Sequence, residues 1–179
     1  MTIRTPLLDE RAIARALVRM ASEIVERCGG TEHLVLVGIQ RRGVELALRL
    51  KRLIDGVERS DVPWGKLDIT LYRDDLQMIG PRPVVGETSL PDIDDRAVVI
   101  VDDVLYTGRT VRAALDEVTD FGRPRRILLC VLVDRGGREL PIQADVVGTT
   151  VSLTATDRVD VLVRELDGRD AVELARAPA

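Results

Sequence analysis

Two adjacent carboxylates are followed in the sequence by a turn rich in hydroxyls and glycine. The apolar run 98–101 leads into Asp102 and Asp103, and helical spacing begins at Arg109. We therefore predict a buried strand, a loop and the start of a helix. Backbone N–H groups at a helix start bind phosphate, and Gly108 lets the chain approach it closely. Because the acid pair suits the vicinal hydroxyls of a ribose, the stretch predicts a sugar-phosphate site.

A strand that ends in two aspartates is equally compatible with an ordinary helix-capping turn. The sequence contains neither G-x-x-x-x-G-K-[ST] nor G-x-G-x-x-G, the motifs of P-loop and dinucleotide sites. The order of strand, acids, hydroxyl-rich turn and helix favours the sugar-phosphate interpretation.

Length and composition indicate one globular unit. The chain has 179 residues, of which 45% are hydrophobic, so we expect a single domain over 1–179 with one buried core. No apolar run approaches the roughly 18 residues of a membrane span, and the N-terminus lacks a signal-peptide pattern. The expected location is the cytoplasm, without contact to a membrane.

The scarcity of certain side chains excludes several enzyme classes. His33 is the single histidine, and no serine lies in a G-x-S-x-G context, which argues against a Ser-His-Asp hydrolase. A metal site of histidines and cysteines is excluded on the same grounds, so any metal is a hard ion such as Mg²⁺, held largely by substrate oxygens. The net charge of −4 argues against a uniformly basic protein but permits one basic face.

Apolar periodicity predicts alternating helices and strands. Helices are expected over 9–27, 44–54 and 111–121, and strands over 34–37, 65–72, 98–101 and 127–133, with short strands near 145–151, 159–163 and 171–174. Cys130 lies inside an apolar run and is expected in the core. This alternation predicts a parallel sheet with right-handed crossovers and helices on its faces.

The turn from Gly38 to Gly43 is a second phosphate candidate, since its backbone amides and Arg41 suit a pyrophosphate. A surface loop with solvated arginines is the alternative. Ligands of parallel sheets bind outside the carboxyl ends of the strands. Chain topology therefore gathers three candidate segments along one edge: 40–43, 102–110 and 134–138.

The run 98–110 resembles the signature of phosphoribosyltransferases that use phosphoribosyl pyrophosphate (PRPP). The spelling Asp-Asp-Val-Leu-Tyr-Thr-Gly-Arg-Thr at 102–110 resembles one branch, the PyrR family of pyrimidine-operon attenuation regulators that are also uracil phosphoribosyltransferases. Two further stretches support this: 68–75 resembles the family's entry to a flexible catalytic loop, and 134–142 resembles Asp-Arg-Gly-His-Arg-Glu-Leu-Pro-Ile. Gly137 stands where that second pattern has histidine.

This resemblance implies an α/β type I phosphoribosyltransferase fold with a small hood from about 134–165 plus the termini. It also implies a flexible loop at about 73–95 and a non-proline cis peptide involving Ile39 or Gln40. Asp102, Asp103 and Arg73 are the expected catalytic residues, and Arg135 and Val159 are expected near the base. The expected PRPP and nucleotide contacts are Gln40, Arg41, Val101, Asp102, Asp103, Val104, Leu105, Tyr106, Thr107, Gly108, Arg109 and Thr110.

The implied ligands are PRPP with Mg²⁺, uracil, and UMP or UTP, in a homodimer or higher oligomer. The family also binds a stem-loop of pyr operon leader mRNA when a uridine nucleotide is bound. Candidate RNA contacts are Arg11, Arg15, Arg19 and Arg138, with a solvated arginine row as the alternative. Neutral or apolar residues replace the family's RNA-contacting ones at Val18, Ser22, Gln143 and Thr149. Three interpretations stay open: an enzyme and regulator, chiefly a nucleotide sensor, or a transferase without RNA binding.

Overall fold

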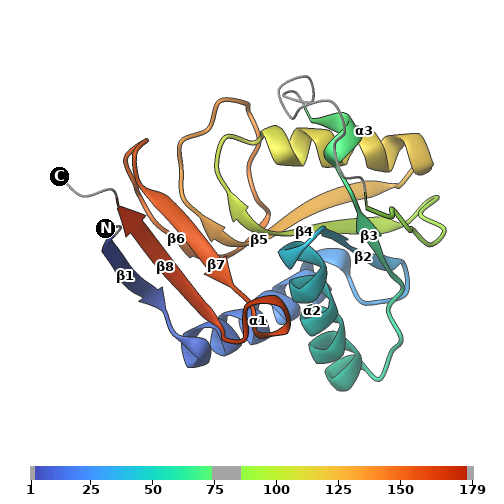
Figure 1. The fold of residues 1–179 in the computed structure, drawn as a ribbon. Coiled ribbons are helices and arrows are strands. Elements are labelled where there is room, and N and C mark those ends of the chain that lie inside the picture. Colours follow the sequence, from blue (N-terminus) through green and yellow to red (C-terminus); the bar gives the residue numbers. More distant parts are fainter. Residues whose placement is uncertain (1–2, 74–85, 177–179) are drawn as a thin grey trace.

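The computed structural model describes residues 3–73 and 86–176 and contains two sheets (Figure 1). The larger sheet has the strand order β3-β2-β4-β5-β6, and each neighbouring pair is parallel. The smaller sheet has the order β1-β8-β7 and is antiparallel. The strands are β1 Ile3–Leu8, β2 Leu34–Ile39, β3 Trp64–Leu67, β4 Ala97–Leu105, β5 Arg126–Asp134, β6 Val146–Thr150, β7 Arg158–Leu162 and β8 Ala171–Arg176.

Helices cover both faces of the large sheet (Figure 1). The helices are α1 Glu10–Cys28, α2 Arg42–Glu58, α3 Arg109–Phe121 and α4 Arg164–Asp167, with a 3₁₀ turn at Thr70–Tyr72. Because successive strand residues point to opposite faces, β4 divides its apolar side chains between two cores. Val99 and Val101 pack with α1 and α2, whereas Val98 and Ile100 pack with α3. The predicted parallel sheet with covering helices is confirmed.

Local capping explains where α1 begins and ends. The side chain of Asp9 accepts a hydrogen bond from Ala12 N at 2.7 Å, and Gly29 adopts the left-handed conformation at the C-terminal end. The inward face of this helix, with Ile13, Leu17 and Met20 among its members, is buried. None of the helices in the described ranges is both long and apolar enough to span a bilayer.

The prediction of a strand over 65–72 was wrong for residues 68–72. The strand ends at Leu67, and a 3₁₀ turn follows in which Leu71 is 58% exposed. Asp68 explains the change, because its carboxylate accepts hydrogen bonds from both the backbone N–H and the hydroxyl of Thr70. Such local bonds compete with a strand ladder. Most of the predicted catalytic loop, residues 74–85, lies outside the described residues.

Gly43 lets α2 begin directly against the strand that carries the acid pair. A Cβ at this position would lie 2.5 Å from the carbonyl oxygen of Val101 and 3.3 Å from Cα of Asp102. We expect Gly43→Ala to lower the free energy of unfolding by about 1–3 kcal/mol, since both neighbours are backbone. Gly56→Ala in the same helix is the matched control, because nothing lies within 4 Å of its Cβ position. Urea unfolding of both variants checks this; equal stabilities would contradict it.

Candidate active site

The three predicted segments meet at the carboxyl edge of the large sheet. Strand β2 leads into the turn of Gln40 and Arg41, β4 leads into the turn 106–108, and β5 ends at Asp134. Since β2, β4 and β5 are parallel neighbours, their carboxyl ends lie side by side. The cis peptide bond of this edge joins Gln40 to Arg41, at one of the two expected residues.

The acid pair lies inside β4, which continues to Leu105 beyond the strand end that the sequence predicted at the two aspartates. Asp102 aligns with Val131 of β5, and Val104 aligns with Val133, so the ladder continues past both carboxylates to Leu105. Asp102 is 7% exposed and Asp103 is half-buried. The strand therefore holds the two carboxylates on a rigid element.

Each carboxylate accepts a hydrogen bond from the backbone N–H of the next residue. Oδ1 of Asp102 accepts from the N–H of Asp103 at 2.9 Å, and Oδ1 of Asp103 accepts from the N–H of Val104 at 2.7 Å. Burial raises the pKa of Asp102 well above its usual range, and the adjacent charge of Asp103 raises it further. Burial also raises the pKa of Asp103, against the lowering effect of the Val104 N–H and the Arg42 guanidinium.

The turn after the acid pair leads into a helix start without a side-chain cap. Gly108 is the N-cap of α3 with φ 92°, and it offers no side-chain oxygen to the first turn. Thr107 Oγ1 accepts from the N–H of Arg109 at 3.3 Å, and Arg109 and Thr110 are exposed. A helix start at a glycine N-cap, beside the hydroxyls of Thr107 and Thr110, is a suitable place for a phosphate.

Arg135 connects this turn to the smaller sheet. It is 5% exposed, and its guanidinium carbon lies 3.7 Å from the ring centroid of Tyr106. Its Nη1 donates to the carbonyl of Asp157 at 2.7 Å, and its Nη2 donates to that of Thr154 at 2.9 Å. The same Tyr106 ring packs on Gly137, where a Cβ would lie 2.4 Å from Cε2 of the ring.

We expect Arg135→Ala to lower the free energy of unfolding by about 2–4 kcal/mol. The change removes the donor to two carbonyls and a buried contact with an aromatic ring. Arg27→Ala is the control, because that arginine makes an exposed pair with Glu23 on its own helix. Guanidinium unfolding compares the two variants, and a small effect of Arg135→Ala would show that this side chain does not hold the two parts together.

A cavity of about 340 Å³ lies between the acid pair and the smaller sheet. Asp103 and Arg42 line it from the large sheet side, and Val159 and Asp160 line it from β7. Arg42 is itself held by Asp167, with N–O distances of 2.8 and 3.2 Å. Sequence reasoning missed two lining arginines, Arg4 and Arg158, because it did not predict β1 and did not place β7 in the same sheet.

The other predicted residues are placed as follows. Arg73 follows the 3₁₀ turn and is exposed. Gln40 donates from Nε2 to the carbonyl of Glu87 at 2.6 Å, and Arg41 is exposed. No group of three or more His, Cys, Asp or Glu side chains suited to a metal occurs within 3–73 and 86–176.

The four arginines predicted to contact RNA differ in their surroundings. Arg11 and Arg15 are exposed on α1. Arg19 donates to the carbonyls of Val147 and Gly148, at 3.1 and 2.5 Å. Arg138 donates to the carbonyls of Ile142 and Tyr106 and to Asp134, and 19% of its side chain is exposed. Two of the four guanidinium groups are thus engaged within the protein.

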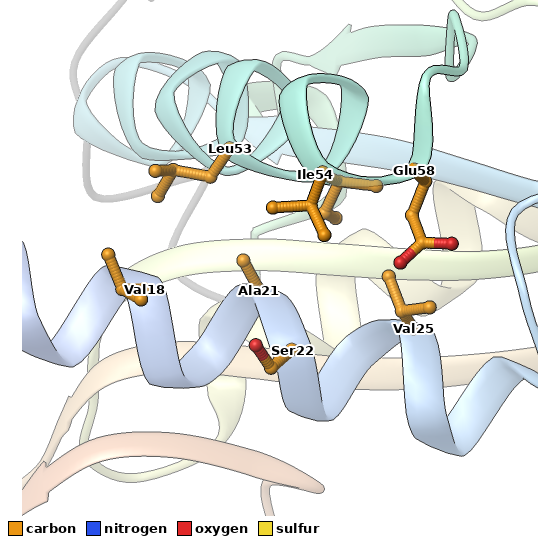
Figure 2. A pocket seen from close by; sticks show the side chains of 8 residues that line it. Val18, Ala21, Ser22, Val25, Leu53, Ile54 and Glu58 are labelled. Atoms are coloured by element: carbon orange, nitrogen blue, oxygen red, sulfur yellow. The ribbon is translucent and has the colours of Figure 1, made fainter.

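The face of α1 that carries Val18 and Ser22 borders an apolar cleft of about 70 Å³ (Figure 2). Val18 and Ala21 of α1 face Leu53 and Ile54 of α2 there (Figure 2). Val18 is 54% exposed. The neutral residues that the sequence analysis noted at 18 and 22 therefore lie on an apolar rather than a basic surface.

Comparison with known proteins agrees with this architecture. A hypoxanthine phosphoribosyltransferase from Staphylococcus aureus superposes with a TM-score of 0.70 at 20% identity, covering 94% of this chain and 90% of that one. A hypoxanthine-guanine phosphoribosyltransferase from Bacillus anthracis gives a TM-score of 0.67 at 20% identity, covering 82% and 83%. At this identity the likeness concerns the fold.

The phosphoribosyl transferase domain family matches residues 4–162, and with the fold this defines the class as a type I phosphoribosyltransferase. The chain is 57% identical over 175 residues to the bifunctional protein PyrR of Thermus thermophilus, covering 97% of both chains. It is 53% identical to the bifunctional protein PyrR of Clostridioides difficile, covering 97% of this chain and 99% of that one. The chain belongs to the PyrR family.

Proposed function

We propose that the protein transfers the phosphoribosyl group of PRPP to uracil, forming UMP and pyrophosphate, and that it binds pyr leader mRNA when a uridine nucleotide is bound. The observation that carries the transferase activity is the acid pair near the carboxyl end of β4, followed by the start of α3 at the N-cap Gly108. Membership of a family whose relatives are named bifunctional supports the two activities together.

Asp102 and Asp103 accept hydrogen bonds from the ribose hydroxyls in this proposal. Cleavage of the bond from C1′ to pyrophosphate leaves positive charge on the ribose ring, and the carboxylates provide negative potential beside it. Residues 107–110 hold the 5′-phosphate through N–H groups and hydroxyls. The protein thus contributes chiefly orientation and charge stabilisation.

The pyrophosphate half of PRPP is assigned to the turn of Gln40 and Arg41. The exposed Arg41 guanidinium can bind phosphate oxygens in a bidentate manner. The site offers one adjacent pair of carboxylates, Asp102 and Asp103, which fits an ion such as Mg²⁺ that takes most of its ligands from PRPP and water. When bound, Mg²⁺ would neutralise part of the negative charge of the pyrophosphate.

Uracil is assigned to the side of the site nearer the smaller sheet. The 340 Å³ cavity joins Asp103 to Val159, and Arg135 fixes the segment 154–157 that precedes β7. A base in this region would lie beside C1′ of a ribose held by the acid pair, as the transfer requires. We propose Arg73 and Val101–Leu105 as further contacts of PRPP.

A transferase without RNA binding is the second candidate function. The apolar surface at Val18 and Ser22 and the internal bonds of Arg19 and Arg138 favour it. Arg11 and Arg15 are the remaining exposed candidates for phosphate contacts. The proposal includes a homodimer or higher oligomer as the assembly, which sedimentation analysis tests.

Two assays separate these functions. Turnover of uracil with PRPP and Mg²⁺ tests the transferase activity, and binding of a pyr leader stem-loop over a salt series tests the RNA activity. The proposal expects turnover and tighter RNA binding in the presence of UMP or UTP. Turnover without nucleotide-dependent RNA binding would establish the second candidate, and absence of turnover would overturn the transferase proposal.

A further inference from the structure

A buried carboxyl group lies on the side of α3 that faces the stems of the long connection between β3 and β4. Glu117 is 3% exposed, and its Oε1 accepts a hydrogen bond from Thr88 Oγ1 at 2.5 Å. Its Oε2 is buried and has no hydrogen-bond partner among the described residues. Thr88 Oγ1 in turn accepts from the N–H of Asp68 at 2.9 Å. The Thr88 hydroxyl thus bonds both Glu117 of α3 and the backbone of Asp68, so it joins the helix to the two ends of the connection between β3 and β4.

The same contacts extend to the turn assigned to pyrophosphate. The residue before Thr88 is Glu87, whose carbonyl accepts from Gln40 Nε2 at 2.6 Å. Asp68 accepts from the N–H of Gly86, and a Cβ at Gly86 would lie 2.6 Å from Asp68 Oδ2 and 2.8 Å from Gln40 Oε1. Gln40 is therefore held against segment 86–88, which is held by Glu117.

The chemistry of Glu117 suits a fixed acceptor rather than a substrate contact. Burial raises its pKa, and the negative charges of Asp68 and Asp120 raise it further, whereas the Thr88 hydroxyl lowers it. Because Thr88 requires only an acceptor oxygen, the neutral amide of glutamine can replace the carboxyl group at this contact. An apolar side chain cannot.

We propose that Glu117 is a positioning residue for phosphoribosyl transfer: through Thr88 it fixes segment 86–88 and thereby the Gln40–Arg41 turn that binds the pyrophosphate half of PRPP. This inference rests on the proposed function. Loss of the contact frees the turn, so the cost falls on ligands that carry pyrophosphate. UMP shares the ribose and 5′-phosphate of PRPP but lacks pyrophosphate, so its binding does not depend on the turn.

The test compares dissociation constants of PRPP with Mg²⁺ and of UMP, measured by calorimetry, with the steady-state KM for PRPP and for uracil. Thr88→Val and Glu117→Leu both remove the hydrogen bond between Thr88 and Glu117, and Glu117→Gln retains it. Thr88→Val also removes the acceptor of the Asp68 N–H. Thr119→Val is the matched control, because the Thr119 hydroxyl bonds only carbonyls of its own helix, those of Leu115 and Asp116. Thr88→Val carries the test if Glu117→Leu fails to fold.

We expect Thr88→Val and Glu117→Leu to weaken PRPP binding and raise its KM by about tenfold, the effect of one lost hydrogen bond to a buried acceptor. UMP binding and the KM for uracil should stay within about twofold, as should every constant of Glu117→Gln and Thr119→Val. The double variant should lose no more PRPP affinity than Thr88→Val alone.

Three results would overturn the inference: unchanged PRPP affinity in Thr88→Val, equal loss of PRPP and UMP affinity, or a Glu117→Gln variant as weak as Glu117→Leu. A merely structural role predicts the second of these, because a smaller folded fraction affects all ligands alike. If the wild-type protein itself neither binds PRPP nor turns it over, the proposed function fails.

Discussion

Replacing Asp102 and Asp103 together by asparagine lowers turnover of uracil and PRPP by roughly a thousandfold or more, the scale of electrostatic stabilisation at a transition state. Asparagine retains an oxygen for the N–H groups of Asp103 and Val104, so the backbone contacts of the acid pair survive. What the variant loses is negative charge beside the ribose. The measurement is steady-state kcat with saturating PRPP and Mg²⁺.

The same double variant should be more stable than the wild type at neutral pH. A carboxyl group whose pKa is raised in the folded state binds more protons folded than unfolded, so stability falls as pH rises from the ordinary value of 3.8 towards the raised one. Above that window the wild type carries the full penalty of two neighbouring charges, one buried and one half-buried, which the amides remove. Thermal melts from pH 4 to pH 8 should show the two proteins diverging as pH rises.

Wild-type turnover in the double variant would refute the role of the acid pair, and a lower Tm across the whole pH range would refute the account of its charge. Asp92→Asn and Asp94→Asn together serve as the control, since both aspartates are exposed on the loop before β4. That pair should leave turnover unchanged.

Gly108→Val should weaken the binding of both PRPP and UMP by about a hundredfold. The residue has φ 92°, which a β-branched side chain adopts at a cost of about 1–2 kcal/mol, and its Cβ would lie 3.3 Å from Cβ of Ile142. The added methyl groups also displace the turn that cradles the 5′-phosphate, which both ligands carry. Calorimetric titration of each ligand measures the effect.

Gly168→Val is the matched control for backbone strain. Gly168 has φ 77° and no atom within 4 Å of its Cβ position, and it follows α4 rather than the phosphate turn. It should cost stability on a similar scale without altering ligand affinity. If the two valine variants bound UMP equally well, the turn 106–110 would not be the phosphate site.

The elements with local signals were predictable from the sequence. The helix-terminating Gly29 and Gly122 and the inward faces of α1 and α3 follow from residue type and spacing. The alternation of strands and helices also predicts that segments 40–43, 102–110 and 134–138 meet at the carboxyl edge of the sheet. Strand β1 was missed because its pairing with β8 joins Ile3 to Arg176, and its first residues are exposed and include a proline.

Residues whose partners are distant backbone groups could not be assigned from the sequence. Arg19 and Arg138 were candidates for RNA contact, with a solvated arginine row as the alternative, yet each donates to a carbonyl that only the tertiary fold brings near. The acids at 102–103 read as the end of a strand, but pairing with β5 extends it through them. Glu117 did leave a signal, since it lies beside Val118 on the apolar face of α3, where a carboxyl group needs a partner.

The most direct test of the central claim is a crystal structure of the protein with PRPP and Mg²⁺. The ribose hydroxyls should lie within hydrogen-bond distance of the Asp102 and Asp103 carboxylates, and the 5′-phosphate should contact the backbone N–H groups of residues 107–110. PRPP bound away from the carboxyl end of β4, or bound there with its 5′-phosphate outside the turn, would contradict the account.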